Sequence, residues 1–394
     1  MKLSNSVILI NNNFENKLML YDRLKHIEYN INPPMFELIS EIHHNNYDYN
    51  HSIQLYDKNI INQLINYEIL VNESEPYINN IKVVKNLDTA RIFLEITDKC
   101  NLKCKHCYGD YKKSNDNSLS LDQIYEIITK AKEVGIYEFD ITGGEPLMYP
   151  HLKEVLQALY QAGMIVSIFT NLTLFDKRIL DVMHQFGVKK IITSLDSSIP
   201  SVHDNFRGYN GAFRKTMDSV QLIRETDIEV SINMTIGNHN KDHIPEIVSF
   251  IRETNLPFVL DVVTPEGRGN DLMEDPIAAS KILKNIYDSY PEIFGYKKRI
   301  IDCGVGKRFI YIKSDGNIYI CPSLIFNQFK LGNIDNFNLN HIWAKMNEIS
   351  KNIFCKERSE DCKSCNGGCR ARAYNQYGNI NAKDKVYCNL IRGH

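Results

Sequence analysis

The distribution of cysteine constrains this chain more than any other feature. Of ten cysteines in 394 residues, none precedes Cys100, three fall within eight residues, and seven lie from Cys303 to Cys388. The amino terminus has no signal-peptide core or cleavage site, and no apolar run approaches the ~18 residues of a membrane span. We therefore expect a cytoplasmic protein, where thiols stay reduced and clustered cysteines indicate metal binding.

The first three cysteines follow a predicted strand with the spacing C-x3-C-x2-C, between Thr97 and Tyr108. Thiolates are the usual ligands of iron–sulfur clusters, and three of them leave one iron of a four-iron cluster open for another molecule. Structural zinc requires four ligands, and a c-type haem requires histidine where this chain has Tyr108. The spacing therefore predicts a [4Fe–4S] cluster on Cys100, Cys104 and Cys107.

Residues 91–300 alternate between strand-like and helical patterns. Predicted strands lie at 92–97, 138–142, 165–170, 190–194, 229–234 and 258–263. Helical stretches lie at 119–134, 150–162, 176–186, 211–226, 242–254 and 276–289. Such alternation predicts an α/β fold, a partial (β/α)6 TIM-type barrel, whose ligands bind at the carboxyl ends of the strands.

The flanking segments differ from the barrel. Residues 1–75 contain three short strand patterns, then helical patterns with a polar loop holding His43, His44 and His51, which we interpret as a winged-helix-like module. Residues 76–90 are expected to be a linker. Residues 301–394 are turn-rich and cysteine-rich, so this segment is expected to have little core and to need metal to fold.

With an aromatic residue following it, the first cysteine motif resembles the hallmark of the radical S-adenosylmethionine (radical SAM) superfamily. The resemblance implies that S-adenosylmethionine chelates the open iron and is cleaved to a 5′-deoxyadenosyl radical, which takes hydrogen from the substrate. It also implies an electron donor such as flavodoxin or ferredoxin.

Polar and glycine-rich segments after the predicted strands resemble the cofactor-binding positions of that superfamily. In Thr142-Gly-Gly-Glu-Pro146, glycine permits close backbone approach and positive φ, and exposed carbonyls could accept from the cofactor's ammonium group. Arg207 is the candidate for the cofactor carboxylate. The full expected set is Tyr108, Thr142, Gly143, Gly144, Glu145, Asn171, Ser194, Arg207 and Asn233. Taken alone, each of the polar residues at the strand ends, Asn171, Ser194 and Asn233, is more often a helix cap or turn residue.

The seven later cysteines begin with C-x12-G-x4-C, where Asp315-Gly316 predicts a hairpin turn that brings Cys303 near Cys321. This half resembles the SPASM extension, which carries two auxiliary [4Fe–4S] clusters. Carrying the family's ligand order across implies one cluster on Cys303, Cys321 and Cys369, and another on Cys355, Cys362, Cys365 and Cys388. The second half departs from the family spacing, so the partition stays open, as do a single cluster and a zinc ion.

The amino-terminal segments Leu20-Tyr21-Asp22 and Tyr29–Asn32 resemble the PqqD-like leader-recognition element, which binds a peptide as an added strand. The combined resemblance implies an enzyme that oxidatively modifies a ribosomally made precursor peptide, through a thioether or other crosslink. In this implied ligand order all ten cysteines would be cluster ligands, which favours oxidation over epimerisation. No catalytic base can be assigned.

Two alternatives stay open. Cys365–Tyr374 also resembles radical enzymes of haem and other small-molecule cofactor biosynthesis. A non-enzymatic iron–sulfur sensor with a winged helix is the other alternative. The net charge of −2 and the single lysine in Lys58–Tyr67 argue against nucleic acid or a membrane as partner.

Overall fold

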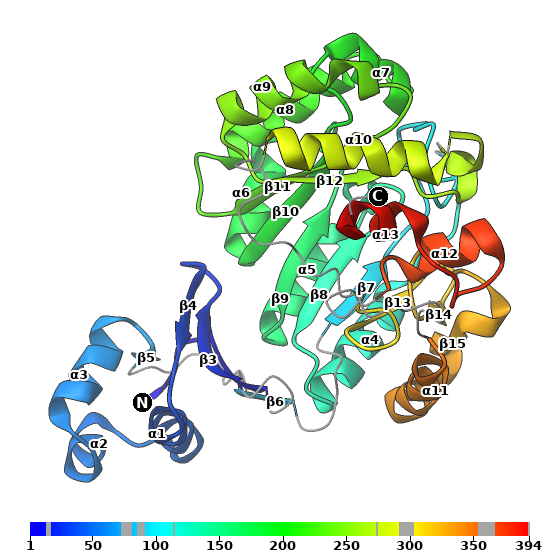
Figure 1. Cartoon of the computed structure of the whole chain (residues 1–394). Coiled ribbons are helices and arrows are strands. Elements are labelled where there is room, and N and C mark those ends of the chain that lie inside the picture. The colour runs from blue at the N-terminus through cyan, green and yellow to red at the C-terminus, as the bar shows by residue number, and fades with distance from the viewer. Residues whose placement is uncertain are drawn as a thin grey trace.

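A nine-stranded sheet runs through the protein and carries the predicted barrel (Figure 1). The computed structural model describes residues 1–12, 17–71, 81–84, 91–112, 115–272, 275–290, 303–353 and 367–392. The sheet has the order β12-β11-β10-β9-β8-β7-β13-β14-β15. Its first six strands are parallel, which confirms the predicted α/β barrel architecture. They are β7 (Arg91–Glu95), β8 (Glu138–Thr142), β9 (Ile165–Phe169), β10 (Val188–Ser194), β11 (Glu229–Ile236) and β12 (Phe258–Val262).

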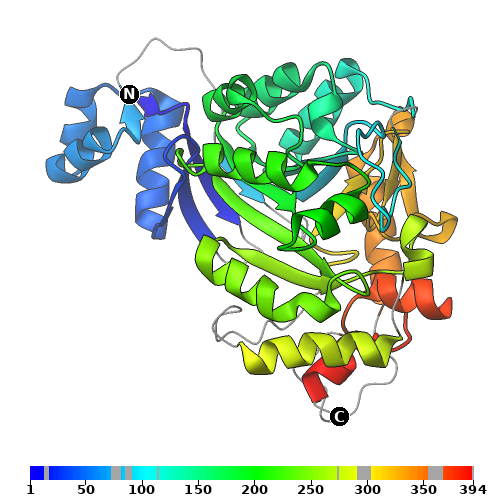
Figure 2. The same ribbon diagram turned by 90° about the horizontal axis from the view of Figure 1, so that it is seen from above.

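Amphipathic helices connect these strands and cover the outer face of the curved sheet (Figure 2). In the first, apolar side chains at helical spacing, Ile124, Ile127 and Ile128, are buried, and Ser120 and Gln123 form a capping box at its start. The six predicted helices are α4 (Leu121–Glu133), α5 (Leu152–Gln161), α6 (Lys177–Gln185), α8 (Ala212–Ile223), α9 (Ile244–Thr254) and α10 (Pro276–Ser289). An additional helix, α7 (Pro200–Arg207), follows β10.

The amino-terminal module combines a four-stranded sheet with three helices. The sheet has the order β4-β3-β2-β6, and β1 (Lys2–Leu3) pairs separately with β5 (Leu70–Val71). The remaining elements are β2 (Val7–Asn12), β3 (Lys17–Asp22), β4 (Ile27–Asn30), β6 (Ile81–Val84), α1 (Pro33–Asn45), α2 (Tyr49–Leu55) and α3 (Lys58–Asn66). The winged-helix interpretation of this module stays a prediction.

Two expectations for this module are wrong. Residues 81–84, expected in a linker, form β6, which pairs parallel to β2 and completes its sheet. The histidines expected in a polar loop are helical, since His43 and His44 lie in α1 and His51 lies in α2. His43 is buried, and its Nδ1 accepts a hydrogen bond of 3.1 Å from the amide of Leu3.

The module is docked on the amino ends of the barrel strands. Its sheet packs Ile8, Ile10 and other apolar side chains against Tyr137, just before β8, and Ile165, the first residue of β9. Arg23 completes this contact, because its guanidinium donates to the carbonyl of Tyr160 at 2.5 Å and lies 4.1 Å from the centre of that ring. The module therefore lies at the opposite end of the barrel from the cysteine loop.

The carboxyl-terminal segment extends the barrel sheet. Strand β13 (Phe309–Ile312) runs parallel to β7 and continues into the antiparallel strands β14 (Asn317–Tyr319) and β15 (Lys330–Asn333). Three helices follow, α11 (Leu339–Lys351), α12 (Arg370–Tyr377) and α13 (Lys385–Arg392). The expectation of little core is wrong here, because Ile310, Ile318 and Trp343 belong to the same buried cluster as the barrel.

None of the helices in the described ranges is both long and apolar enough to cross a membrane.

Candidate iron–sulfur and cofactor site

The loop after β7 gathers three cysteines at the carboxyl end of the barrel. Cys100 and Cys104 are buried and Cys107 is half-buried, and all three belong to one small cluster with Leu102 and nearby tyrosines. The amide of Cys107 donates to the carbonyl of Cys104 at 3.3 Å, which folds the second half of the motif into a tight turn. The three cysteines therefore lie in one cluster, and their ligation of iron stays a prediction.

Burial makes ionisation of these thiols costly without a bound cation. Burial, followed by the charge of Glu145, raises the pKa of Cys100 to about 12. Burial also raises the pKa of Cys104, against the opposing charge of Arg207. In the described ranges, no three His, Cys, Asp or Glu side chains stand in ready metal-holding geometry, so ligation by these thiols stays a prediction. Iron would supply the charge that three adjacent thiolates need, so this donor set fits the cluster.

The Gly143–Gly144 turn packs directly on the cysteine loop. The amide of Gly144 donates to the carbonyl of Thr97, and the amide of Glu145 donates to that of Lys99, both at 2.8 Å. A Cβ on Gly143 would lie 2.6 Å from the carbonyl oxygen of Thr97, and one on Gly144 would lie 2.3 Å from that of Lys99. Neither glycine has a positive φ, so that expectation is wrong. Glycine is required here because the backbones touch.

Glu145 and Asn171 hold neighbouring loops together. The carboxylate of Glu145 is fully buried and accepts from the hydroxyl of Thr170 at 2.6 Å and from the amides of Asn171 and Leu147 at 2.7 and 3.0 Å. Burial raises the pKa of Glu145 to about 7, although these hydrogen bonds oppose the shift. The Asn171 amide group donates to Asn101, within the cysteine loop, at 3.0 Å. Direct cofactor contact by Glu145 and Asn171 stays a prediction.

Arg207 lies between a buried carboxylate and a cysteine. Its Nε donates to Asp196 at 2.6 Å, and its Nη1 lies 3.6 Å from the sulfur of Cys104. Burial would raise the pKa of Asp196, but Arg207 holds it well below its usual range. The structure therefore assigns Arg207 an ion pair beside the cluster loop, and its predicted role toward the cofactor carboxylate stays a prediction.

The other predicted contacts lie around the same mouth of the barrel. Ser194 and Asn233 are paired across β10 and β11, both half-buried. Thr142 ends β8, and the Tyr108 ring lies 5.5 Å from that of Tyr111 in an edge-on arrangement. Beside them is a cavity of about 550 Å³ lined by residues that include Lys105, Phe206, His239 and Val263.

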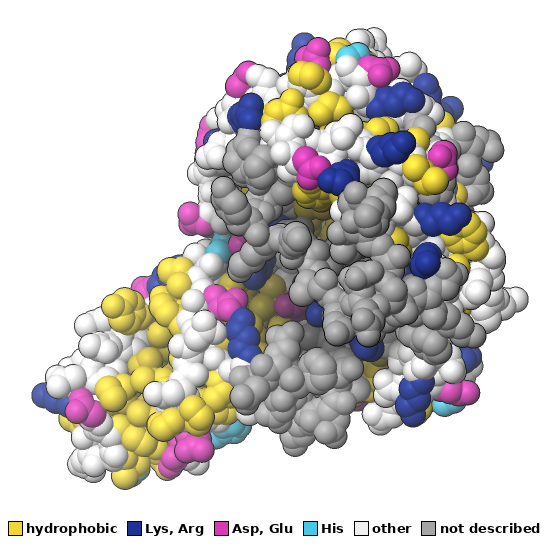
Figure 3. Space-filling view, viewed as in Figure 1, with side chains coloured by type: hydrophobic (Ala, Val, Ile, Leu, Met, Phe, Trp, Pro, Cys, Tyr) yellow, Lys and Arg dark blue, Asp and Glu magenta, His cyan; other side chains and the backbone are white. Residues whose placement is uncertain are grey.

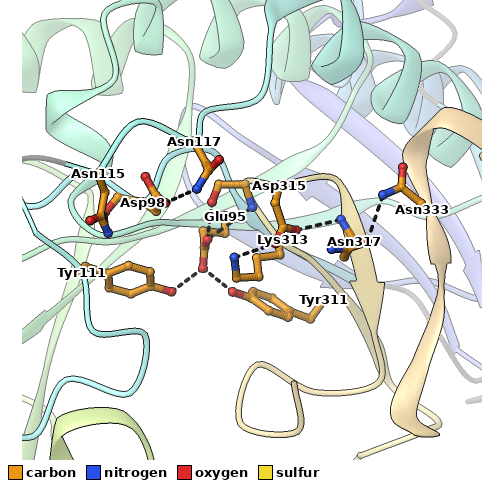
Figure 4. Close-up of polar contacts among 11 residues, drawn as sticks. Glu95, Asp98, Tyr111, Asn115, Asn117, Tyr311, Lys313, Asp315, Asn317 and Asn333 are labelled. Atoms are coloured by element: carbon orange, nitrogen blue, oxygen red, sulfur yellow. Dashed lines mark hydrogen bonds and ion pairs between the residues drawn. The ribbon is translucent and has the colours of Figure 1, made fainter. Parts of the chain in front are cut away.

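The sequence did not reveal a buried carboxylate that joins the cysteine loop to the carboxyl-terminal hairpin (Figure 4). Glu95, the last residue of β7, accepts hydrogen bonds from the phenols of Tyr111 and Tyr311 and from the hydroxyl of Ser314 at 2.6 Å. Burial raises the pKa of both tyrosines well above its ordinary value, so they stay protonated donors. The available signal was a lone acidic residue in the apolar run Ile92–Ile96.

Three of the later cysteines are neighbours. Cys303, Cys321 and Cys369 pack against the main core, and burial followed by the charges of Cys303 and Cys369 raises the pKa of Cys321 well above its usual value. The predicted hairpin turn is confirmed, because β13 and β14 are antiparallel and Gly316 has a φ of 80°. Cys388 is buried in α13, and Cys355, Cys362 and Cys365 lie outside the described residues.

Family models match both cysteine-bearing parts. The radical SAM superfamily model matches residues 94–251, and the SPASM iron–sulfur cluster-binding domain matches residues 303–369. This chain is a radical SAM enzyme with a SPASM domain. Its cofactors are accordingly [4Fe–4S] clusters and S-adenosylmethionine, and the alternative of a non-enzymatic sensor is set aside.

Relatives of this radical SAM enzyme are named for different activities. The chain is 27% identical over 333 residues to an AdoMet-dependent heme synthase of Methanosarcina barkeri, covering 75% of this chain and 94% of the relative. It is 30% identical over 252 residues to the subtilosin biosynthesis protein AlbA of Bacillus subtilis, covering 61% of this chain and 56% of AlbA.

Solved structures share the fold. SuiB of Streptococcus suis superposes with a TM-score of 0.64 at 15% identity, covering 98% of this chain and 99% of SuiB. The anSMEcpe protein with bound AdoMet superposes with a TM-score of 0.63 at 19% identity, covering 76% of this chain and 94% of anSMEcpe.

Proposed function

We propose that this radical SAM enzyme installs an oxidative modification, a thioether or another crosslink, in a ribosomally made precursor peptide. The observation that carries the proposal is an open strand edge on the docked amino-terminal module. Within the described ranges, β4 pairs only with β3, so its second edge leaves backbone donors and acceptors free for an added strand.

The surface near this edge suits an extended peptide. Hydrophobic side chains gather on the face of the module seen in Figure 3. On the strand itself Ile27 is 41% exposed, and Leu24, in the preceding turn, is 38% exposed. Exposed apolar groups of this kind next to an open edge would provide side-chain contacts, while the backbone provides hydrogen bonds.

Several relatives support a peptide substrate. AlbA is named for subtilosin biosynthesis, and a PqqA peptide cyclase of Bradyrhizobium diazoefficiens is 21% identical over 314 residues. SuiB has been solved bound to the precursor peptide SuiA, and that structure covers 97% of this chain, amino-terminal module included. We infer the same class of partner here, with a flavodoxin or ferredoxin as electron donor, in the cytoplasm.

Different residues of the chain would hold the clusters, fix the cysteine loop and frame the cofactor. Cys100, Cys104 and Cys107 would hold the cluster that binds S-adenosylmethionine, and this pair supplies a hydrogen-abstracting radical when bound. Glu95 and Arg207 would fix the loop, and the Thr142–Glu145 turn would frame the cofactor. We assign Cys303, Cys321 and Cys369 to one auxiliary cluster and Cys355, Cys362, Cys365 and Cys388 to the other.

The reaction is tested with a short peptide encoded beside the gene. Anaerobic incubation with S-adenosylmethionine and reductant should lower the peptide mass by two hydrogens, because a crosslink removes two hydrogen atoms. An unchanged mass with 5′-deoxyadenosine released would contradict an oxidative product.

The open edge is tested separately by peptide binding. Replacing Ile27 with Asp should weaken binding of the fluorescently labelled peptide at least tenfold, about 1.4 kcal/mol, because a charge would face the added strand. Leu55→Asp is the matched control, since Leu55 is a similarly exposed apolar residue on α2. Equal affinity of the two variants would rule out this edge as the binding surface.

Haem biosynthesis is the second candidate, because the heme synthase of M. barkeri is matched over 94% of its length. That candidate predicts that the enzyme forms haem from a porphyrin precursor, seen as a change in absorbance. The open edge of the amino-terminal module favours the peptide.

A further inference from the structure

Two buried arginines directly follow the last cysteine of the SPASM match, in the sequence Cys369-Arg370-Ala371-Arg372. They begin α12, whose amino end is capped by the Cys369 side chain, with the Arg372 amide 3.4 Å from its sulfur. Burial raises the pKa of Cys369 to about 12, and among the nearby charges Arg372 opposes this shift most. The backbone amide of Arg372 therefore contacts a predicted cluster ligand, and its guanidinium charge acts on that ligand from nearby.

Arg372 also bridges the SPASM domain and the barrel. Its guanidinium forms ion pairs with Asp384 at 3.1 Å and with Asp261 of β12 at 2.9 Å. Asp384 in turn accepts from the amide of Cys369 at 2.8 Å. The cation is thus held rigidly beside Cys369 by one fully buried carboxylate and one half-exposed carboxylate.

These arginines keep donors that no described residue satisfies. In the described ranges, Nε of Arg372 and Nε and Nη2 of Arg370 are buried and have no acceptor. By contrast, all three guanidinium nitrogens of the equally buried Arg23 donate to backbone carbonyls. A buried charged donor without an acceptor is costly, so an acceptor beyond the described residues is expected beside these arginines.

We propose that Arg372 is a positioning residue for the auxiliary cluster on Cys369 and raises the reduction potential of that cluster. The inference rests on the proposed ligation by Cys303, Cys321 and Cys369. One-electron reduction adds negative charge to a cluster, and a buried cation near a ligand stabilises the reduced form. A higher potential favours electron uptake at this site, which suits an oxidative reaction.

The test measures a potential and needs no substrate. Full-length protein carrying Cys100→Ala, Cys104→Ala and Cys107→Ala is loaded with iron and sulfide and titrated under redox control with EPR detection. The relevant signal is the one that Cys321→Ala removes. Arg372→Gln should lower the ratio of reduced to oxidised cluster at fixed potential at least tenfold, a midpoint about 59 mV more negative.

Two variants serve as controls. Arg372→Lys keeps the charge and should stay within about threefold of the parent ratio. Arg23→Gln removes an equally buried guanidinium at the other end of the barrel and should leave the midpoint unchanged.

If Arg372→Gln holds iron and keeps the midpoint potential of the parent protein, this inference is refuted and the proposed function is not. If that variant does not retain iron, Asp261→Asn replaces it, because this half-exposed carboxylate is the ion-pair partner of Arg372. Removing this negative charge should make the midpoint potential more positive. An unchanged midpoint potential would overturn the inference. A signal that survives Cys321→Ala would instead refute the proposed ligand set, and this inference with it.

Discussion

Single side chains in this protein act mainly as buried links between distant segments. Glu95 is the strongest example, since one carboxylate accepts from Tyr111 after the cysteine motif and from Tyr311 in the SPASM hairpin. Hydrogen bonds to a charged group contribute more than neutral ones, and a buried group left unpaired is costly. These links are therefore where substitutions should have large effects.

Replacing Glu95 with Gln should lower the free energy of unfolding by about 2 kcal/mol, because two phenols lose a charged acceptor. Denaturant unfolding followed by tryptophan fluorescence measures this, since the single tryptophan, Trp343, lies in the same core cluster as the hairpin. Tyr125→Phe, at an exposed position of α4, is the control and should have little effect. An unchanged free energy of unfolding in Glu95→Gln would show that the hydrogen bonds to Glu95 do not stabilise the fold.

His43 should make the amino-terminal module sensitive to acid. Burial lowers the pKa of His43 to about 4, below its unfolded value near 6.5. Its contribution is therefore full above pH 6.5 and lost as the pH falls toward 4, a change of roughly 3 kcal/mol. Hydrogen exchange of the β2 and β3 amides should accelerate across this range, and His43→Gln should flatten the dependence. His44→Gln, at the exposed neighbouring position, should keep the wild-type profile.

At the scale of elements, loops at the carboxyl ends of parallel strands are fitted to one another by backbone contact. The turn after β8 lies against the loop after β7, and the loop after β9 is tied to both through Asn101 and Glu145. An atom added at Gly143 or Gly144 would meet the backbone of Thr97 or Lys99, just before Cys100.

Gly144→Ala should therefore reduce iron loading of the first cluster to less than half. The added Cβ would lie 2.3 Å from the carbonyl oxygen of Lys99, which is backbone and cannot rotate away. Iron content and 5′-deoxyadenosine release measure the effect. Gly332→Ala in β15 is the control, because its Cβ would meet nothing closer than 3.8 Å. Normal iron loading of Gly144→Ala would contradict the assigned packing.

At the scale of the whole molecule, one sheet unites two domains while the amino-terminal module is attached at the far end. The SPASM hairpin continues the barrel sheet through β13, so the two cysteine regions share a core. The module instead contacts the barrel through a small apolar cluster and Arg23. Cofactor cleavage and peptide capture should therefore be separable.

Arg23→Gln tests this separation. The variant should show faster hydrogen exchange in β2, β3 and the end of α5, because the guanidinium loses its contacts with Tyr160 and Ser6. Peptide modification should slow several-fold, while 5′-deoxyadenosine release without peptide stays unchanged. Arg178→Gln, fully solvent-facing on α6, should alter neither measurement. An equal loss of cofactor cleavage in Arg23→Gln would refute separability.

The sequence by itself determined the cysteine loop, the order of the barrel elements and the hairpin turn at Gly316, because these depend on local spacing and on apolar periodicity. It did not show that residues 81–84 pair with β2, or that His43 lies buried within a helix. Only the tertiary structure decided that Glu95 meets Tyr311, 216 residues away, and that Arg372 meets Asp261. The physical reason is that such partners are chosen by which surfaces the folded sheet brings together, and no local pattern encodes that choice.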